Sequence, residues 1–313
     1  MTPNRFELLC ALERAPAGLS AQEAAGQAGL PLSLARYELT DLDSEQLVFS
    51  PEKGLWHISQ RGLQALSPYR VRRAVILAAG FGSRLNPLTN RIPKPMIPVN
   101  GVRMIDTLLD ALYAAEIPEV HLIRGHLGEA FDALVEKYPR LQFTDNPLFA
   151  SSNNLSSALY AKEWLQNAYI CDADLLLLNP RIIRKYELRT NYLGCWCEHT
   201  DDWRFHLDGE FIEGASVGGD NCCRMFGLSY WTEADGRRLA EDIVQTAGTS
   251  WGREHFWDEV PLTLCKKHYR IALRVCGPKD ILEIDTLEEL AALDASYRPL
   301  LGQASPCLLY TSD

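Results

Sequence analysis

A buried strand that runs straight into a loop of small residues is the feature that most constrains this fold. Residues 74–85 read AVILAAGFGSRL, an apolar run followed by Gly-Phe-Gly-Ser. Glycine lets a backbone approach a ligand closely, and successive N–H groups in such a loop can bind phosphate oxygens without any side chain. The pattern therefore predicts a phosphate-binding loop at the carboxyl end of a strand.

Two commoner phosphate-binding motifs do not fit this loop. It lacks the Gly-Lys-Ser/Thr of a Walker A motif, and Leu85 stands where a dinucleotide fingerprint has its third glycine. Arg84 follows the glycines instead, and Lys94 lies ten residues further on in a Pro-Lys-Pro-Met sequence. Because the chain has a formal net charge of −10, a phosphate site needs local cations, and these two side chains supply them.

From Ala74 onward, short apolar runs alternate with amphipathic stretches. We expect helices at 104–115 and 155–165, and strands at 74–78, 120–124, 142–144, 168–171 and 192–197. Such alternation predicts an α/β domain with a mostly parallel sheet. Binding sites in these folds gather at the carboxyl ends of the strands.

Two pairs of acidic residues follow apolar runs. Asp172 and Asp174 end one run, and Glu283 and Asp285 alternate so that both would lie on one face of a strand. Magnesium takes hard oxygen ligands and often uses only one or two protein carboxylates together with phosphate oxygens. These acids are candidates for a metal site, although Asp285 could instead cap the helix that we expect from Leu287.

The glycine loop followed by Pro-Lys-Pro resembles the signature of the nucleotidyltransferases that activate sugars and alcohol phosphates. The resemblance implies a Rossmann-like nucleotidyltransferase fold and magnesium (Mg2+) as cofactor. It makes Arg84, Lys94 and Asp174 the catalytic residues, and Asp174 and Asp285 the metal ligands. The triphosphate would lie against the loop residues Leu77, Ala78, Ala79, Gly80, Gly82 and Ser83.

Five of the seven tryptophans fall between residues 196 and 257. Aromatic faces attract quaternary ammonium groups, although large aromatic residues also pack in cores. Residues 143–285 resemble the phosphocholine cytidylyltransferases of bacterial choline incorporation, at Asp202-Trp203 and Phe-Trp-Asp among other positions. The resemblance implies a cage of Trp203, Phe256 and Trp257, with Glu254 or Asp258 adding negative charge.

The expected substrates are CTP and phosphocholine, with Asn153 and Asn154 reading the cytosine and the ribose. A phosphate oxygen of phosphocholine would attack the α-phosphorus of CTP, so that CDP-choline forms and pyrophosphate leaves. Phe256 stands where this family suggests tyrosine, and Glu254 where it suggests aspartate. Other phosphorylated headgroups such as aminoethylphosphonate, sugar 1-phosphates, and a nucleotide-sensing transcriptional regulator therefore stay open as alternatives.

Residues 1–70 form a separate unit in which helices at 6–12, 21–27 and 34–42 precede a short hairpin and a last helix. The order resembles the winged helix-turn-helix domains of MarR-like regulators. Six basic and eight acidic residues give this unit a net charge of −2. Because duplex DNA is bound by neutralising its phosphates, we favour a docking or regulatory role over DNA binding.

The bulk properties predict a cytoplasmic protein. No apolar run reaches 18 residues, and the nine cysteines include no CxxC pair, which favours reduced thiols over zinc or disulfides. We assign residues 71–298 to the nucleotidyltransferase domain and leave a homodimer open.

Residues 299–313 form a tail. Its last seven residues, 307–313, can be encoded by a transposon adapter used in sequencing libraries, so we expect them to be non-native. The native chain would then continue, and a choline-kinase-like domain behind residue 300 is our expectation for it.

Overall fold

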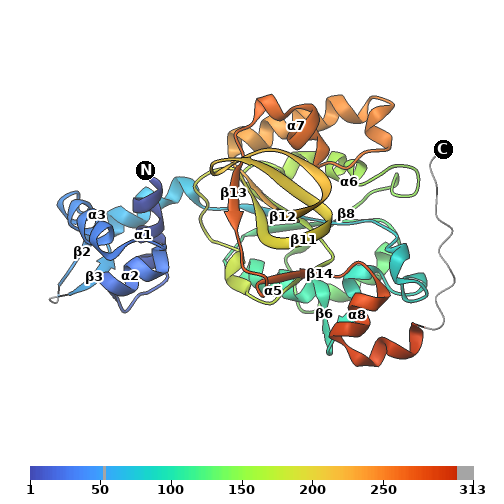
Figure 1. The fold of residues 1–313 in the computed structure, drawn as a ribbon, viewed down its shortest axis with the longest axis horizontal. Coiled ribbons are helices and arrows are strands. Elements are labelled where there is room, and N and C mark those ends of the chain that lie inside the picture. The colour runs from blue at the N-terminus through green and yellow to red at the C-terminus, as the bar shows by residue number, and fades with distance from the viewer. Residues whose placement is uncertain (52–53, 302–313) are drawn as a thin grey trace. The chain divides into compact units, whose positions relative to one another are not determined.

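The computed structural model describes residues 1–51 and 54–301, and the chain divides into two compact units (Figure 1). The small unit contains Met1–Val71 and the short segment Tyr186–Leu188. The large unit contains Arg72–Lys185 and the chain from Arg189 onward. The predicted non-native end, 307–313, lies outside the described residues.

The described residues of the small unit form four α-helices, a 3-10 helix at Ser67–Tyr69, and three short strands in the sheet order β1-β3-β2. Ser20 begins α2 with a reciprocal capping box to Glu23, and Gly29, in the left-handed conformation, ends it. The elements are α1 (Pro3–Glu13), β1 (Leu19–Ser20), α2 (Ala21–Ala28), α3 (Leu32–Ser44), β2 (Val48–Phe49), β3 (Leu55–Ile58) and α4 (Gln60–Leu66).

The predicted order of helices and hairpin is present in the small unit, with β1 as an addition. Turn residues 52 and 53 of the hairpin lie outside the described residues. The identification as a winged helix domain stays a prediction.

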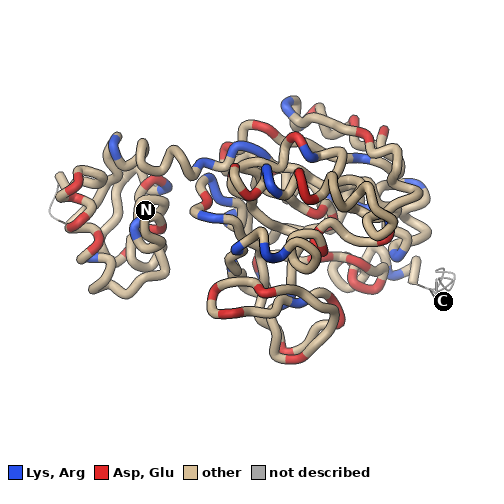
Figure 2. Tube along the Cα trace, turned by 90° about the horizontal axis from the view of Figure 1, so that it is seen from above, with Lys and Arg blue, Asp and Glu red and all other residues tan. Residues whose placement is uncertain are grey.

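Acidic and basic residues are interspersed along the small unit (Figure 2). Arg5 lies between acids of α3, with its Nη2 atom 2.7 Å from Glu45 and 3.5 Å from Asp41. These acidic neighbours neutralise the charge of Arg5, so this arginine is not free to bind DNA phosphates. The docking or regulatory role that we favour over DNA binding stays a prediction.

A seven-stranded mixed sheet with the order β11-β13-β12-β9-β4-β7-β8 forms the centre of the large unit. The pairs β9–β4, β4–β7 and β7–β8 are parallel, and β12 joins β9 in antiparallel orientation. This arrangement confirms the predicted α/β fold with a mostly parallel sheet. The strands are β4 (Arg73–Ala78), β7 (Glu119–Arg124), β8 (Leu141–Asp145), β9 (Ala168–Asp172), β11 (Asn191–Asp208), β12 (Phe211–Trp231) and β13 (Ala272–Val275).

Helices cover both faces of this sheet, with α6 and α7 on one side and α5 on the other (Figure 1). Two small two-stranded sheets pair β5 with β6 and β10 with β14. The predicted helix at 155–165 ends at Tyr160 and gives way to a 3-10 turn. The bounds are α5 (Met104–Ala114), α6 (Leu155–Tyr160), α7 (Glu233–Ala247), α8 (Leu287–Leu293), β5 (Pro98–Val99), β6 (Val102–Arg103), β10 (Leu175–Leu177) and β14 (Ile281–Glu283).

Alternate residues of β4 explain why this strand lies at the centre of the unit. Val75 and Leu77 join a core cluster with residues of α6 and α7, and Ala74 and Ile76 are also fully buried. Burying one such large apolar side chain stabilises the fold by about 1.5–3 kcal/mol. The core therefore fixes the strand that leads into the glycine loop.

The strands β11 and β12 pair in antiparallel orientation to form a long curled hairpin, which we call the ribbon. Thr200 pairs with Gly219 and Trp203 pairs with Val217, so β11 has one residue more than β12 between these pairs. Such a β-bulge increases local twist and redirects side chains. The bulged residues Asp201 and Asp202 directly precede Trp203, which places the bulge beside the aromatic residue that the sequence singled out.

No helix in the described part of the chain combines the length and the apolar character that a membrane span requires.

Candidate functional site

A cavity of about 710 Å³ opens at the carboxyl ends of β4 and β9. We call its two halves the loop end and the aromatic end. The loop end is formed by residues 77–84, Lys94, Asp174, Glu283 and Asp285. The aromatic end is formed by Asp172, Asp202, Trp203, Ala215, Met225, Gly227, Phe256, Asp258, Glu259, Leu262 and Thr263. Most of the residues that the sequence selected therefore line one cavity.

The glycine loop has the backbone that its sequence predicts. Gly82 adopts a φ of 61°, in the left-handed region, and a Cβ there would lie 2.9 Å from Cβ of Lys94. Gly82 is therefore needed both for the turn and for the close passage of the lysine. Gly80 has open space where a Cβ would be, so the loop leaves room for a ligand at that point.

Lys94 is buried at the centre of the loop end and bridges two carboxylates. Its Nζ donates hydrogen bonds to Asp174 Oδ2 at 2.7 Å and to Asp285 Oδ1 at 2.8 Å. Burial alone would lower the pKa of Lys94, but the charges of Asp174 and Asp285 outweigh burial and raise it. The exposed Arg84 donates from Nη2 to the same Asp285 oxygen at 2.7 Å. Both predicted cations thus reach the predicted acids.

Three carboxylates meet beside this lysine. Asp174, Glu283 and Asp285 each offer an oxygen, and these atoms lie within 4.8 Å of one another. Asp174 Oδ1 is buried without a hydrogen-bond partner, and burial, followed by the charges of Asp174 and Asp285, raises the pKa of Glu283. An orphaned carboxylate oxygen among crowded acids suits a divalent cation that takes oxygen ligands, such as Mg2+.

The position of Asp285 differs from the sequence expectation in one respect. The sequence predicted that Glu283 and Asp285 share one face of a strand. β14 ends at Glu283, however, so Asp285 lies outside the strand. The N-cap of α8 is Thr286, whose hydroxyl accepts from the N–H of Glu289. The alternative in which Asp285 caps this helix is therefore wrong, and the Asp285 carboxylate is left to bind Lys94 and Arg84.

Two of the three predicted cage rings face the cavity. Trp203 and Phe256 meet edge to face, with centroids 6.4 Å apart and an interplanar angle of 77°. Trp257 lies in the core instead, 1% exposed and stacked at 6.1 Å on Tyr192. Glu254 is exposed and does not line the cavity. The aromatic end therefore has an open pair of rings rather than a closed cage.

Buried acids complete the aromatic end. Tyr192 Oη donates to Asp258 Oδ1 at 2.6 Å, yet burial raises the pKa of Asp258 to about 7. Burial and then the charge of Asp258 also raise the pKa of Asp172. A Cβ on Gly227 would lie 1.8 Å from Asp172 Oδ2, so β12 needs glycine there to accommodate this carboxyl group. Both acids can receive a cationic ligand without a resident basic partner.

Arg224 connects the two ends of the cavity, a link that the sequence did not reveal. Its Nη2 lies 2.9 Å from Asp202 Oδ2 and 3.4 Å from Glu283 Oε2, and it donates to both. Arg224 thereby holds one acid of each end in place.

Asn153 and Asn154 line the cavity and also hold its aromatic wall. Asn153 Nδ2 donates to the carbonyl oxygen of Glu254 at 3.2 Å, and Asn154 Oδ1 accepts from the N–H of Trp257 at 2.9 Å. These bonds fix the segment that carries Phe256. Recognition of cytosine and ribose by the two asparagines stays a prediction.

Several cavity residues were absent from the sequence prediction, among them Phe81, Phe149, Gly227, Glu259 and Thr263. Gly227 carried a usable signal, since an isolated glycine within an apolar strand often marks close approach of another group. Glu259 directly follows the predicted Asp258, but its neighbour Val260 is fully buried. Sequence order alone does not show that Glu259 lines the cavity while Val260 packs in the core.

Comparisons with known proteins find relatives of the large unit. The family model described as Nucleotidyl transferase matches residues 73–189. The 2-aminoethylphosphonate cytidylyltransferase of Lancefieldella rimae is 35% identical over 236 residues, which cover 73% of this chain and 94% of the relative. The choline-phosphate cytidylyltransferase of Streptococcus pneumoniae is 28% identical over 225 residues, which cover 71% and 96%. The solved CTP:phosphocholine cytidylyltransferase from S. pneumoniae aligns with a TM-score of 0.68, covering 72% of this chain and 99% of that one at 28% identity.

Proposed function

Because the chain belongs to the nucleotidyl transferase family and has cytidylyltransferases among its relatives, we propose that it transfers CMP from CTP to a small zwitterionic acceptor. The acceptor carries a phosphonate or phosphate at one end and an amine at the other. CTP is the proposed donor because the relatives that match most of their length are cytidylyltransferases.

The distribution of cations and acids between the two ends of the cavity carries this proposal. The loop end offers Arg84, Lys94 and a glycine loop to phosphates. Among the described residues that line the aromatic end there is no Lys, Arg or His, whereas Asp172, Asp202, Asp258 and Glu259 are all acidic. A substrate that is anionic at its reacting end and cationic at its headgroup matches both halves.

The chain's own residues account for an in-line displacement. An oxygen of the acceptor phosphonate or phosphate forms a bond to the α-phosphorus of CTP, the bond from that phosphorus to the bridging β-phosphate oxygen breaks, and pyrophosphate leaves. Loop N–H groups bind phosphate oxygens, while Lys94 and Arg84 neutralise the charge that accumulates on the leaving group. No covalent intermediate with the enzyme is required.

Magnesium is the proposed cofactor, held by Asp174 and Asp285 with Glu283 as a further oxygen donor. When bound, Mg2+ neutralises phosphate charge and helps to orient the triphosphate. Lys94 shares the same two aspartates, so its ammonium group is already poised beside the phosphates that would enter the site.

For the headgroup, we favour a primary ammonium, as in 2-aminoethylphosphonate. Its N–H groups can donate hydrogen bonds to the carboxyl groups of Asp172 and Asp258, whereas a quaternary ammonium cannot donate. With Trp257 in the core, only Trp203 and Phe256 remain to surround a methylated nitrogen. These two rings support phosphocholine, the acceptor predicted from the sequence, as the second candidate.

A substrate matrix tests the proposal. Pyrophosphate release is measured with Mg2+ and each of CTP, UTP, dTTP and ATP, crossed with 2-aminoethylphosphonate, phosphoethanolamine, phosphocholine and glucose 1-phosphate. We expect turnover with CTP and the amine-bearing acceptors, and the highest kcat/KM with 2-aminoethylphosphonate. Preference for phosphocholine would favour the second candidate, and preference for glucose 1-phosphate would overturn the assignment of the aromatic end. An absence of turnover with every pair would favour a nucleotide-sensing regulator over an enzyme.

A further inference from the structure

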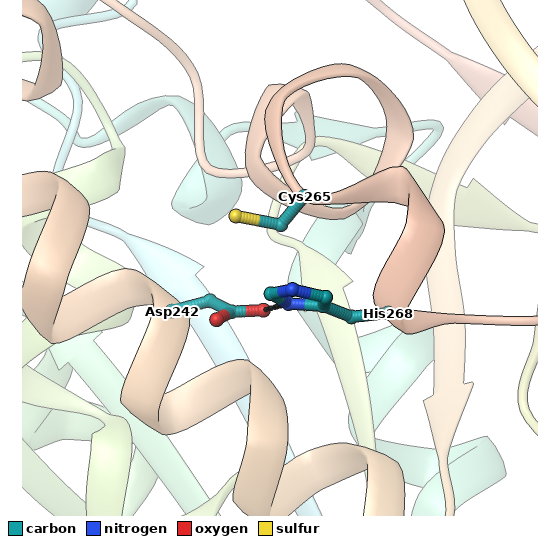
Figure 3. A group of neighbouring side chains, drawn as sticks. All are labelled: Asp242, Cys265 and His268. Atoms are coloured by element: carbon teal, nitrogen blue, oxygen red, sulfur yellow. Dashed lines mark hydrogen bonds and ion pairs between the residues drawn. The ribbon is translucent and has the colours of Figure 1, made fainter.

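A second group of metal-ligand side chains lies outside the cavity, between α7 and the segment that follows Asp258. Asp242 comes from α7, whereas Cys265 precedes the 3-10 helix Lys266–His268 and His268 ends it (Figure 3). One ligand atom from each of the three residues lies within 4.8 Å of the others. His268 Nδ1 is 2.8 Å from Asp242 Oδ2.

The donor set of this group differs from that of the catalytic acids. It combines one carboxylate oxygen, one imidazole nitrogen and one thiol sulfur, whereas the group at the loop end consists of the three carboxylates Asp174, Glu283 and Asp285. Zn2+ binds this mixture at about 2.0–2.3 Å per ligand, so neighbouring donors of a tetrahedral site lie roughly 3.3–3.6 Å apart. The pair His268 Nδ1 and Asp242 Oδ2, at 2.8 Å, would separate by roughly half an ångström to reach that geometry.

The burial of the three side chains suits a metal site with one open position. Asp242 is 2% exposed, Cys265 is partly buried, and the side chain of His268 is 44% exposed. Tyr269 Oη also donates to Asp242 Oδ2, which orients the carboxylate from behind. Water can reach the group from the side of His268.

We propose that Asp242, Cys265 and His268 form a zinc-binding site whose fourth ligand is water. The spacing Cys265-Lys-Lys-His268 places two ligands within one turn of chain, and Asp242 supplies the third from a separate helix. The site joins α7 to the segment that carries Asp258, Leu262 and Thr263 into the cavity.

The alternative that these residues form a nucleophilic Cys-His-Asp triad is disfavoured. Burial and the charge of Asp242 raise the pKa of the Cys265 thiol, whereas a nucleophilic cysteine needs a lowered one. The contact of His268 Nδ1 with Asp242 occurs in such triads too, so the thiol makes the distinction. A bound cation would instead displace the thiol proton and use the sulfur as a ligand.

Cobalt(II) provides a direct test because a thiolate bound to Co2+ absorbs in the near ultraviolet and a carboxylate does not. The full chain is reduced, freed of metal, saturated with Mg2+ to fill the catalytic carboxylates, and titrated with Co2+. We expect a stoichiometric thiolate-to-cobalt band that Zn2+ abolishes, because Zn2+ displaces Co2+ from such ligands. Absence of the band would overturn the proposal.

Two matched variants assign the band to its cysteine. Cys265→Ser keeps a hydroxyl donor for Asp242, so it should fold normally but lose the band. Cys197→Ser replaces another partly buried thiol, on the ribbon, and should keep it. A band that persists in Cys265→Ser would contradict the assignment.

Thermal unfolding gives an independent readout. Because Zn2+ bound only to the folded state stabilises it, Zn2+ should raise the Tm of the wild-type chain and of Asp174→Asn, but not that of Cys265→Ser. An equal rise in all three proteins would place the ion elsewhere and overturn the proposal.

Discussion

The loop end and the aromatic end of the cavity differ in how they carry charge. At the loop end, each cation has an acidic partner, as in the pair formed by Lys94 and Asp174 at 2.7 Å. At the aromatic end, Asp202 pairs with Arg224, whereas Asp172 and Asp258 form no ion pair with the described residues, and desolvation raises the pKa of both. The loop end is thus charge-compensated before substrate arrives, whereas two acids of the aromatic end are left for a ligand to compensate.

This difference indicates which end of the cavity supports the reaction and which end selects the acceptor. A preorganised, paired site can stabilise charge that changes during the reaction with little rearrangement. An unpaired acidic pocket gains most when a cation enters it, which favours recognition over chemistry. Changes at the loop end should therefore lower kcat, and changes at the aromatic end should raise the KM of the acceptor.

The largest expected effect comes from Lys94→Met, which removes the ammonium group but keeps a long side chain. We expect kcat to fall about 10³-fold, since one preorganised charge donor contributes on this scale. Pyrophosphate release at saturating CTP, acceptor and Mg2+ measures it. The control is Lys137→Met, which removes an exposed lysine paired with Asp110. A kcat for Lys94→Met equal to that of the control would remove the lysine from catalysis.

Asp258→Asn tests the aromatic end with a substitution of nearly equal size. We expect the KM of the acceptor to rise about 10- to 100-fold, because a hydrogen bond to a charged group contributes roughly 1.5–3 kcal/mol. The KM of CTP should not change. Asp220→Asn, an exposed acid of the ribbon, is the matched control. If Asp258→Asn lowered kcat alone, the division of labour between the two ends would fail.

The pH dependence of acceptor binding sharpens the same comparison. Since the pKa of Asp258 is raised from 3.8 to about 7, the carboxyl group is neutral below that pH and charged above it. The KM of the acceptor should therefore fall as pH rises through about 7, by up to about tenfold per unit below it. The acceptor's own ionisation affects both proteins equally. Dividing the KM–pH profile of wild type by that of Asp258→Asn therefore cancels this contribution. A flat ratio would exclude this role.

The raised pKa of Asp258 also predicts how the free energy of unfolding changes with pH. A folded-state pKa above the unfolded value means that ionising Asp258 costs stability, so its contribution is lost as pH rises from about 4 to about 7. Urea unfolding of wild type and Asp258→Asn should show the wild-type free energy of unfolding falling more steeply over this interval. Parallel curves would contradict the raised pKa.

The smallest expected effect comes from Phe256→Leu, which keeps an apolar wall but removes a ring. We expect kcat/KM for phosphocholine to fall about 2- to 5-fold, the size of a partly exposed cation–π contact of about 0.5–1 kcal/mol. The loss with 2-aminoethylphosphonate should be smaller, because hydrogen bonds to acids dominate there. Phe49→Leu, in the small unit, is the control. Equal losses with both acceptors would indicate packing rather than cation recognition.

The loop end could be predicted from the sequence because its parts are contiguous and each residue type is dictated by chemistry. The glycines and Arg84 lie in one short stretch, and Lys94 lies shortly downstream. Asp174 lies just beyond β9, the strand that pairs with β4 in the sheet. A parallel α/β sheet brings such strand ends together, so local patterns were sufficient to assemble this half of the site.

The aromatic end could be predicted only in part because burial there depends on remote contacts. Trp203 and Trp257 belong to the same aromatic-rich stretch, yet Trp203 lines the cavity and Trp257 packs against Tyr192. The hydrogen bond from the Trp257 N–H to Asn154 spans 103 positions of sequence, and no periodicity encodes it. Arg224 was missed for the same reason, since both of its partners lie on other strands or loops.

The bulge in the ribbon has a consequence for how acceptor choice can diversify. The extra residue between Thr200 and Trp203 sets which way Asp202 and Trp203 point. Losing or gaining one codon here would change two walls of the pocket at once, while Lys94, Asp174 and Asp285 lie on other segments and keep their places. A lineage could in this way exchange one amine for another in a single insertion or deletion, without passing through an inactive ancestor.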